Sequence, residues 1–148
     1  SASSQQALQY VGEFPFPPQL DVRVMHVLPP PPIHPSDFTI SGDMPIETLG
    51  VSGALAAEQE RQEIAGQQLL QAAVETLEGY GITAVPVLQR GDAATQIIEY
   101  IQEQKIDLTV CGSRGLSEIR SWLMGSVSRK LIHYSGGSVL VVRGTSAD

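Results

Sequence analysis

Apolar residues along the chain follow two spacings, one typical of strands and the other typical of helices. The first strand-like run, residues 22–28, is apolar on both faces, as in a sheet that is covered on two sides. Further strand-like runs span residues 82–88, 106–111 and 139–142. Helix-like runs, with apolar positions every three or four residues, span residues 4–11, 51–80, 94–101 and 126–134.

Single residues indicate where some of these elements lie. Pro86 cannot donate a hydrogen bond to a neighbouring strand, so residues 82–88 are expected at an edge of the sheet. Asp92 is a suitable N-cap for the helix that follows it. Residues 58–63 are polar on nearly all sides of the long helix, and we expect that half to extend beyond the core.

The segment of residues 29–50 is unusual. It is rich in proline, with Pro29 to Pro32 consecutive, and it contains three acidic residues but no lysine or arginine. It is too long for an ordinary connection between elements, and such loops are usually lids or disordered segments. We expect residues 29–50 to be a loop, and both a lid and a disordered segment remain open.

Strands that alternate with helices predict an α/β domain with parallel strands and right-handed crossovers. The 148 residues suit a single domain, residues 1–148. The pattern begins with a helix, however, whereas a doubly wound sheet normally begins with a strand that lies centrally, at the topological switch point. The sequence therefore predicts a doubly wound sheet from which the first strand is missing.

Composition limits the classes of partner. The net charge of −7 argues against nucleic acid or an anionic membrane as the main partner. One cysteine excludes an intramolecular disulfide, and the histidines are too isolated to suggest a metal site. No apolar run approaches the roughly 20 residues of a membrane span and no signal peptide is visible, so the cytoplasm is the expected location.

A glycine motif carries the clearest chemistry. Gly112-Ser113-Arg114-Gly115 follows a buried strand and is separated by nine residues from Gly125-Ser126, where a helix begins. In such a turn, backbone N–H groups can face an anion, and the helix N-terminus adds about half a positive charge. The motif predicts a phosphate site and hence a nucleotide-binding domain.

These residues resemble the universal stress protein family, whose nucleotide-binding signature is Gly-x2-Gly-x9-Gly-Ser/Thr. His26-Val27 is similar to the end of that family's second strand, and residues 1–8 are similar to the start of its first helix. The resemblance implies a Rossmann-like three-layer sandwich of the adenine nucleotide alpha-hydrolase type, with strand order 3-2-1-4-5. The family's first strand, and the aspartate after it, would precede Ser1. Because its absence would leave a gap of about 10 Å, we expect a fragment, an offset in numbering, or a strand supplied by another chain.

The resemblance also implies that ATP or AMP binds along the motif, with Mg²⁺ possible beside ATP and held mainly by phosphate and water oxygens. The base and ribose side would be formed by Val27, Cys111 and Gly112. The phosphate side would be formed by Arg114, Gly115, Gly125, Ser126, Val127 and Ser128.

Simpler interpretations stay open beside these. Gly112 and Gly115 would also suit an ordinary tight loop, and Ser126 would also suit a plain helix cap. Arg129 and Lys130 are interpreted as surface residues, His26 as structural and Cys111 as an inert core thiol.

Three functions compete at this stage. The first is a nucleotide-binding stress-response or signalling module that hydrolyses ATP slowly or not at all, because no general base or nucleophile pair is recognisable. The second is an enzyme on a related fold, and the third is a dimeric interaction scaffold with an unoccupied site. The resemblance further implies a homodimer formed by the last strand, through Val139, Leu140, Val141 and Val142.

Overall fold

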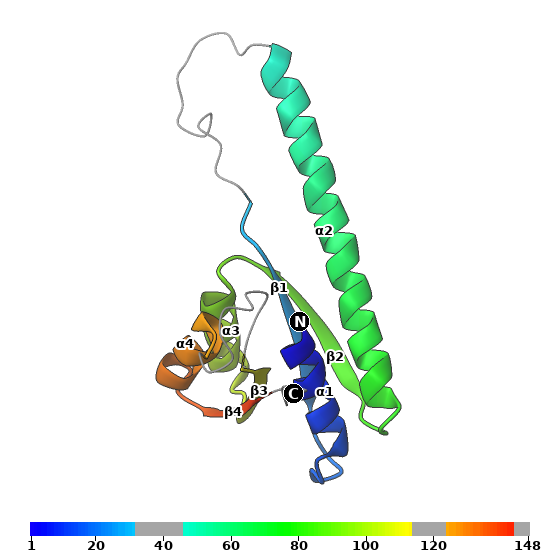
Figure 1. The fold of residues 1–148 in the computed structure, drawn as a ribbon, viewed down its shortest axis with the longest axis vertical. Coiled ribbons are helices and arrows are strands. Elements are labelled where there is room, and N and C mark those ends of the chain that lie inside the picture. The colour runs from blue at the N-terminus through cyan, green and yellow to red at the C-terminus, as the bar shows by residue number, and fades with distance from the viewer. Residues whose placement is uncertain (32–45, 114–123, 144–148) are drawn as a thin grey trace, which may run out of the picture.

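The computed structural model describes residues 1–31, 46–113 and 124–143. Helices and strands alternate along the chain in the predicted order (Figure 1). They are α1 (Ala2–Glu13), β1 (Val22–Leu28), α2 (Ile46–Glu78), β2 (Ala84–Arg90), α3 (Ala93–Gln104), β3 (Leu108–Gly112), α4 (Ser126–Tyr134) and β4 (Ser138–Val142).

Several element boundaries differ from the sequence prediction, and three of them have a clear local cause. Residues 46–50 were assigned to the proline-rich loop, but they form the first turn of α2, directly after Pro45 in the sequence. Proline is favoured in the first turn of a helix. Ile82 and Ile106 do not begin strands, because their amides bond back to the carbonyls of Leu77 and Ile101 at 3.0 Å and so complete the ends of α2 and α3.

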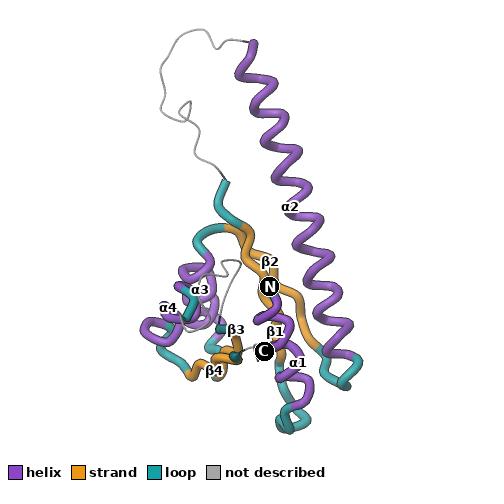
Figure 2. Tube along the Cα trace, in the orientation of Figure 1, coloured by secondary structure: helices purple, strands orange, loops and turns teal. Residues whose placement is uncertain are grey.

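The four strands form two separate parallel pairs, β1 with β2 and β3 with β4 (Figure 2). Val22 is aligned with Ala84 in the first pair, and Leu108 is aligned with Ser138 in the second. Pro86 lies in β2, which has β1 as its one neighbour among the described residues, so the predicted edge position is confirmed. Among the same residues, β1 and β3 each have a partner strand on one side only. Their unpaired sides are the position at which the expected order places the first strand.

Helices cover both faces of the strands. Val74 and Leu77 of α2 form a buried cluster with Ala84 of β2. Val22 and Val24 of β1 pack against this cluster, and so does α1. Arg23, between them in the sequence, points the other way and donates a hydrogen bond to Tyr100 of α3 at 3.3 Å. Figure 1 accordingly shows α1 and α2 on one side of the strands and α3 and α4 on the other. The predicted α/β class with parallel strands is confirmed.

The long helix α2 meets the sheet closely at one point and then leaves it. A Cβ placed on Gly66 would lie 3.0 Å from Leu88 and 3.1 Å from Leu28, so a glycine allows the helix to pack on β1 and β2 here. The 33 residues of α2 span about 50 Å, and its first half projects beyond the body (Figure 1). Most described residues in that half are exposed, as the polar residues 58–63 predict. No helix in the described part of the chain is long and apolar enough to cross a membrane.

Candidate functional site

Two helix N-termini meet the carboxyl end of β3. The hydroxyl of Ser128, in the first turn of α4, donates a hydrogen bond to the carbonyl oxygen of Gly112 at 2.8 Å. On another side, a Cβ placed on Gly112 would lie 2.5 Å from the carbonyl carbon of Ser3, in the first turn of α1. Each helix N-terminus carries about half a positive charge. The end of β3 is therefore a place that favours a negative group.

Backbone hydrogen bonds fix both ends of the glycine motif. The amide of Ser113 donates to the carbonyl of Val142 in β4, and the amide of Gly125 donates to the carbonyl of Ser113, each at 2.8 Å. The loop therefore leaves β3 and returns to α4 at nearly the same point. Arg114 and Gly115, both predicted phosphate contacts, lie outside the described residues.

The first turn of α4 contains backbone amides that no intrahelical hydrogen bond uses. Gly125 is the N-cap and supplies no side-chain hydrogen bond to the helix. The intrahelical bonds begin with the amide of Arg129, which donates to Gly125 at 3.1 Å. The amides of Ser126, Val127 and Ser128 precede it and have no acceptor within the helix. Those three amides are the donors that a phosphate group needs.

Ser128 and Cys111 have a structural task behind this turn. Ser128 is buried, and its hydroxyl holds α4 against β3 through Gly112, so that hydroxyl is already engaged within the protein. Burial raises the pKa of the Cys111 thiol, while a hydrogen bond with Ser128 lowers it by less. The thiol therefore stays protonated at neutral pH, in agreement with its interpretation as an inert core residue.

Val27 lies at the corresponding end of the other strand pair. It is the penultimate residue of β1 and is aligned with Gln89 of β2. Its neighbour His26 packs against Gly66 of α2, and burial lowers the pKa of its imidazole. A neutral, packed histidine fits the structural role expected from the sequence.

The structure also bears on Lys130, which was interpreted from the sequence, and on Ser3, which was not. Lys130 lies 3.8 Å from the Asp92 carboxylate in an exposed pair, which supports its interpretation as a surface residue. Sequence reasoning missed Ser3, because the helix was expected to begin at Ser4. The available signal is Ser1, whose hydroxyl caps α1 by accepting a hydrogen bond from the Ser4 amide at 3.3 Å.

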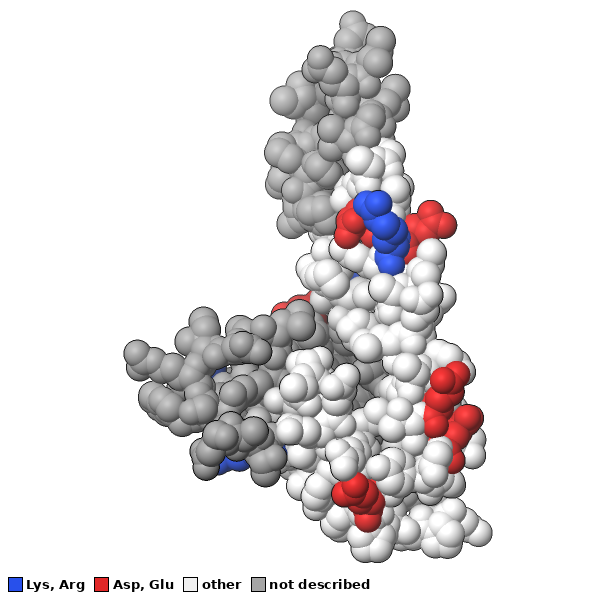
Figure 3. Space-filling view, turned by 45° about the vertical axis from the view of Figure 1, so that its right-hand side comes forward, with Lys and Arg blue, Asp and Glu red and all other residues white. Residues whose placement is uncertain are grey.

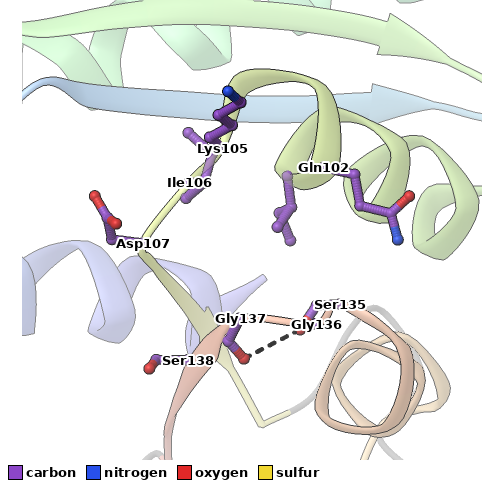
Figure 4. Close-up of a pocket in the computed structure, with 9 residues that line it drawn as sticks. Gln102, Lys105, Ile106, Asp107, Ser135, Gly136, Gly137 and Ser138 are labelled. Atoms are coloured by element: carbon purple, nitrogen blue, oxygen red, sulfur yellow. Dashed lines mark hydrogen bonds between the residues drawn. The ribbon is translucent and has the colours of Figure 1, made fainter.

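An open depression of about 650 Å³ lies at the opposite, amino ends of β3 and β4 (Figure 4). Lys105 and Asp107, of opposite charge, line it together with residues 135–138. α3 and α4 both end here, so their negative dipole ends point toward it. A polyphosphate is therefore disfavoured in this depression and favoured at the glycine motif.

The surface charge sets a further condition on the site. Figure 3 shows acidic side chains at several heights along the face that α2 forms, and one group of basic atoms among them. In this region Arg61 is paired with Glu58 at 2.8 Å. Among the described residues, no three histidine, cysteine or acidic side chains gather in a way that would hold a metal ion. The acidic surface therefore gives an anionic ligand no general attraction, and the first-turn amides of α4 are local donors.

Known proteins share this arrangement. The model of the universal stress protein family matches residues 1–143. The chain belongs to the universal stress protein family. This membership agrees with the resemblance noted from the glycine signature.

Individual relatives agree with this assignment. Universal stress protein YxiE of Bacillus subtilis is 35% identical over 78 residues, 53% of this chain and 53% of that protein. The chain thus spans about half the length of that relative. Universal stress protein MJ0577 of Methanocaldococcus jannaschii is 24% identical over 97% of this chain and 89% of that protein.

Solved universal stress protein structures have the same fold. MJ0577 superimposes with a TM-score of 0.79 at 19% identity, covering 99% of this chain and 92% of that one. A family member from Arabidopsis thaliana, solved with AMP bound, superimposes with a TM-score of 0.66 at 18% identity, covering 99% of this chain and 81% of that one. The Rossmann-like sandwich is therefore shown for this chain.

Proposed function

We propose that this universal stress protein binds an adenine nucleotide, ATP or AMP, at the carboxyl end of β3 and signals stress through the bound state. The observation that carries the proposal is the meeting of α1 and α4 at Gly112, where the first-turn amides of α4 have no acceptor within their helix. The relative from Arabidopsis thaliana with AMP bound supports the choice of nucleotide. We expect ATP hydrolysis to be slow or absent, since no nucleophile and base are paired in the described part of the motif.

In this proposal the phosphates contact Gly125, the amides of residues 126–128 and the main chain of Arg114 and Gly115. Val27, Cys111 and Gly112 line the base and ribose. Mg²⁺ accompanies ATP and is bound by phosphate and water oxygens, because no set of protein ligands is available among the described residues. The protein acts in the cytoplasm, a location that fractionation of the source cells tests directly.

Replacement of Ser126 by aspartate tests the phosphate contact. Ser126 is exposed in the first turn of α4, so a carboxylate there suits the helix dipole and leaves the fold intact. It would repel a phosphate a few ångströms away, and we expect ATP affinity to fall about tenfold or more. Titration calorimetry with ATP and adenosine measures both effects, because adenosine has no phosphate to repel.

Ser126→Asn is the matched control, since it has the same shape without the charge. It should retain ATP affinity within about twofold. Equal ATP binding by Ser126→Asp and Ser126→Asn contradicts the proposed contact, and no ATP binding by the unsubstituted protein favours the unoccupied scaffold instead.

We also propose that a further parallel strand lies between β1 and β3, completing the order 3-2-1-4-5. The free sides of β1 and β3 support it. Residues of both strands are largely half-buried, although both would be central in a completed sheet. Residues 1–148 would then form one domain with that strand.

The outer strand β4 supports a homodimer in the same proposal. It pairs with β3 on one side and is apolar, through Val139, Leu140, Val141 and Val142. An exposed apolar edge is a pairing hazard unless another strand covers it. Val141→Pro should give monomers in sedimentation, and a persistent dimer would place the interface elsewhere.

A further inference from the structure

Arg90, the last residue of β2, ties together the end of β1 and the helix α2. Its guanidinium donates hydrogen bonds to the carbonyl oxygen of Pro29 and the side-chain oxygen of Gln62, both at 3.2 Å. A third bond reaches the carbonyl oxygen of Gln59 at 3.3 Å. The side chain therefore spans the chain just after β1 and the part of α2 that leaves the body.

The next residue completes this connection. The amide of Gly91 donates to the carbonyl of Leu28 at 2.9 Å. Arg90 and Gly91 thus hold the carbonyls of both Leu28 and Pro29, the two residues that follow Val27. The Leu28 side chain also lies against α2, at Gly66.

The sequence of the held segment explains why an arginine is required. Residues 29–31 are prolines, which have carbonyl acceptors but no amide donors. Such a segment cannot join a ladder through its own donors, so a donor from elsewhere must fix it. A guanidinium has five N–H groups in one plane and can bond several acceptors at once, which a lysine ammonium does less specifically.

We propose that Arg90 is a positioning residue for the nucleobase. It fixes the main chain directly after Val27 against α2 and so sets where the Val27 backbone lies beside the base, without touching the nucleotide. This role rests on the proposed function, since Val27 is a base contact only if an adenine nucleotide binds. The guanidinium is already bonded to three acceptors on the α2 side, away from the amides of α4, so it is not a phosphate ligand.

The test compares Arg90→Ala with Arg23→Ala as the matched control. Arg23 also joins β1 to a helix, through Asp21 and Tyr100, but near the start of the strand. Calorimetry measures ATP, GTP and inorganic tripolyphosphate. Loss of charged hydrogen bonds behind the base should weaken ATP about tenfold and reduce the preference for ATP over GTP. Tripolyphosphate affinity should stay within about twofold of the unsubstituted value, and Arg23→Ala should match the unsubstituted protein for all three.

Arg90→Lys should recover only part of the ATP affinity, because a compact ammonium does not match the three spread acceptors as a planar guanidinium does. If ATP and tripolyphosphate weaken equally in Arg90→Ala, the residue stabilises the fold and does not position the base, and the proposal is overturned. Unchanged ATP affinity and unchanged base preference overturn it as well.

Hydrogen exchange separates this proposal from the proposed function. If the unsubstituted protein binds no nucleotide, the proposed function fails, and the exchange rate of the Leu28 amide, which faces β2, decides the positioning role. Faster exchange in Arg90→Ala but not in Arg23→Ala supports it. Equal exchange in the two variants overturns it.

Discussion

A side chain at position 112 would collide with the first turn of α1. The added Cβ would lie 2.5 Å from the Ser3 carbonyl carbon and 2.6 Å from its oxygen, which are backbone atoms that no rotamer change can move. The close approach of α1 to β3 therefore requires glycine here. The same approach brings the second helix N-terminus to the candidate site.

We predict that Gly112→Ala displaces α1 and weakens both stability and ATP binding. Overpacking of this kind costs about 1–3 kcal/mol, and the ATP affinity should fall with the loss of one helix N-terminus. Thermal melts and calorimetry measure the two effects. Gly53→Ala is the control, because nothing lies within 4 Å of its added Cβ, and it should be neutral or slightly stabilising. Equal behaviour of the two variants would contradict the contact.

At the level of residues, the sequence predicted the motif well and the supporting contacts poorly. Gly112, Gly125 and Ser126 lie where the signature places them, at a strand end and a helix start. Ser3 and Arg90 were not expected to matter, since their importance comes from neighbours more than 25 positions away in the sequence. Local patterns do not contain that information.

Helix α3 shows how one cap joins an element to its surroundings. Asp92 accepts hydrogen bonds from the Thr95 amide at 3.0 Å and the Thr95 hydroxyl at 2.8 Å. These bonds, with a smaller contribution from Lys130, hold the pKa of Asp92 below its usual value of 3.8. The predicted N-cap is confirmed, and its charge state links the stability of α3 to pH.

We predict that Asp92→Ala lowers the melting temperature at pH 7 and that the difference shrinks in acid. A carboxyl with a depressed folded pKa stabilises the fold above its unfolded pKa, near 3.8, and this contribution is lost as the pH falls through the folded pKa. Melts at pH 7 and near pH 3 measure the change. Asp92→Asn caps without titrating, so its difference from Asp92→Ala should vary much less with pH. If the difference in melting temperature between the unsubstituted protein and Asp92→Ala does not change with pH, the assignment of Asp92 as a charged N-cap is contradicted.

Element type was predictable and element ends were not. The apolar periodicity of residues 51–80 reported a helix correctly, but it did not show that the helix begins at Ile46. Ile82 and Ile106 look like strand residues, yet their amides close helix ends. Hydrophobic residues indicate which positions are buried, but they do not show whether a backbone amide bonds to a helix or to a strand. The start of a strand depends on that bonding.

At the scale of the molecule, the described residues form two parallel strand pairs with helices on both faces. One side of β1 and one side of β3 have no partner among these residues, which is where the order 3-2-1-4-5 expected from the family resemblance places a further strand. The long projection of α2 was expected from its polar residues.

We predict that alternate amides of β1 and β3 exchange rapidly in a monomer of residues 1–148. In a parallel strand, alternate amides face opposite sides, so one set is protected by the existing partner and the other set faces the gap. Hydrogen exchange followed by NMR resolves the two sets, and a strand supplied from upstream or by another chain should protect both. Uniform protection in the isolated monomer would contradict a missing strand.

The most direct measurement of the central claim is an ATP titration followed through backbone amide resonances. Binding at the carboxyl end of β3 predicts that the amides of Gly112, Ser126, Val127 and Ser128 shift together and saturate. The amides of Gly136 and Gly137, at the opposite end of the sheet, should stay in place. Shifts confined to the depression beside Lys105 and Gly136, or no saturable shift at all, would contradict nucleotide binding at the glycine motif.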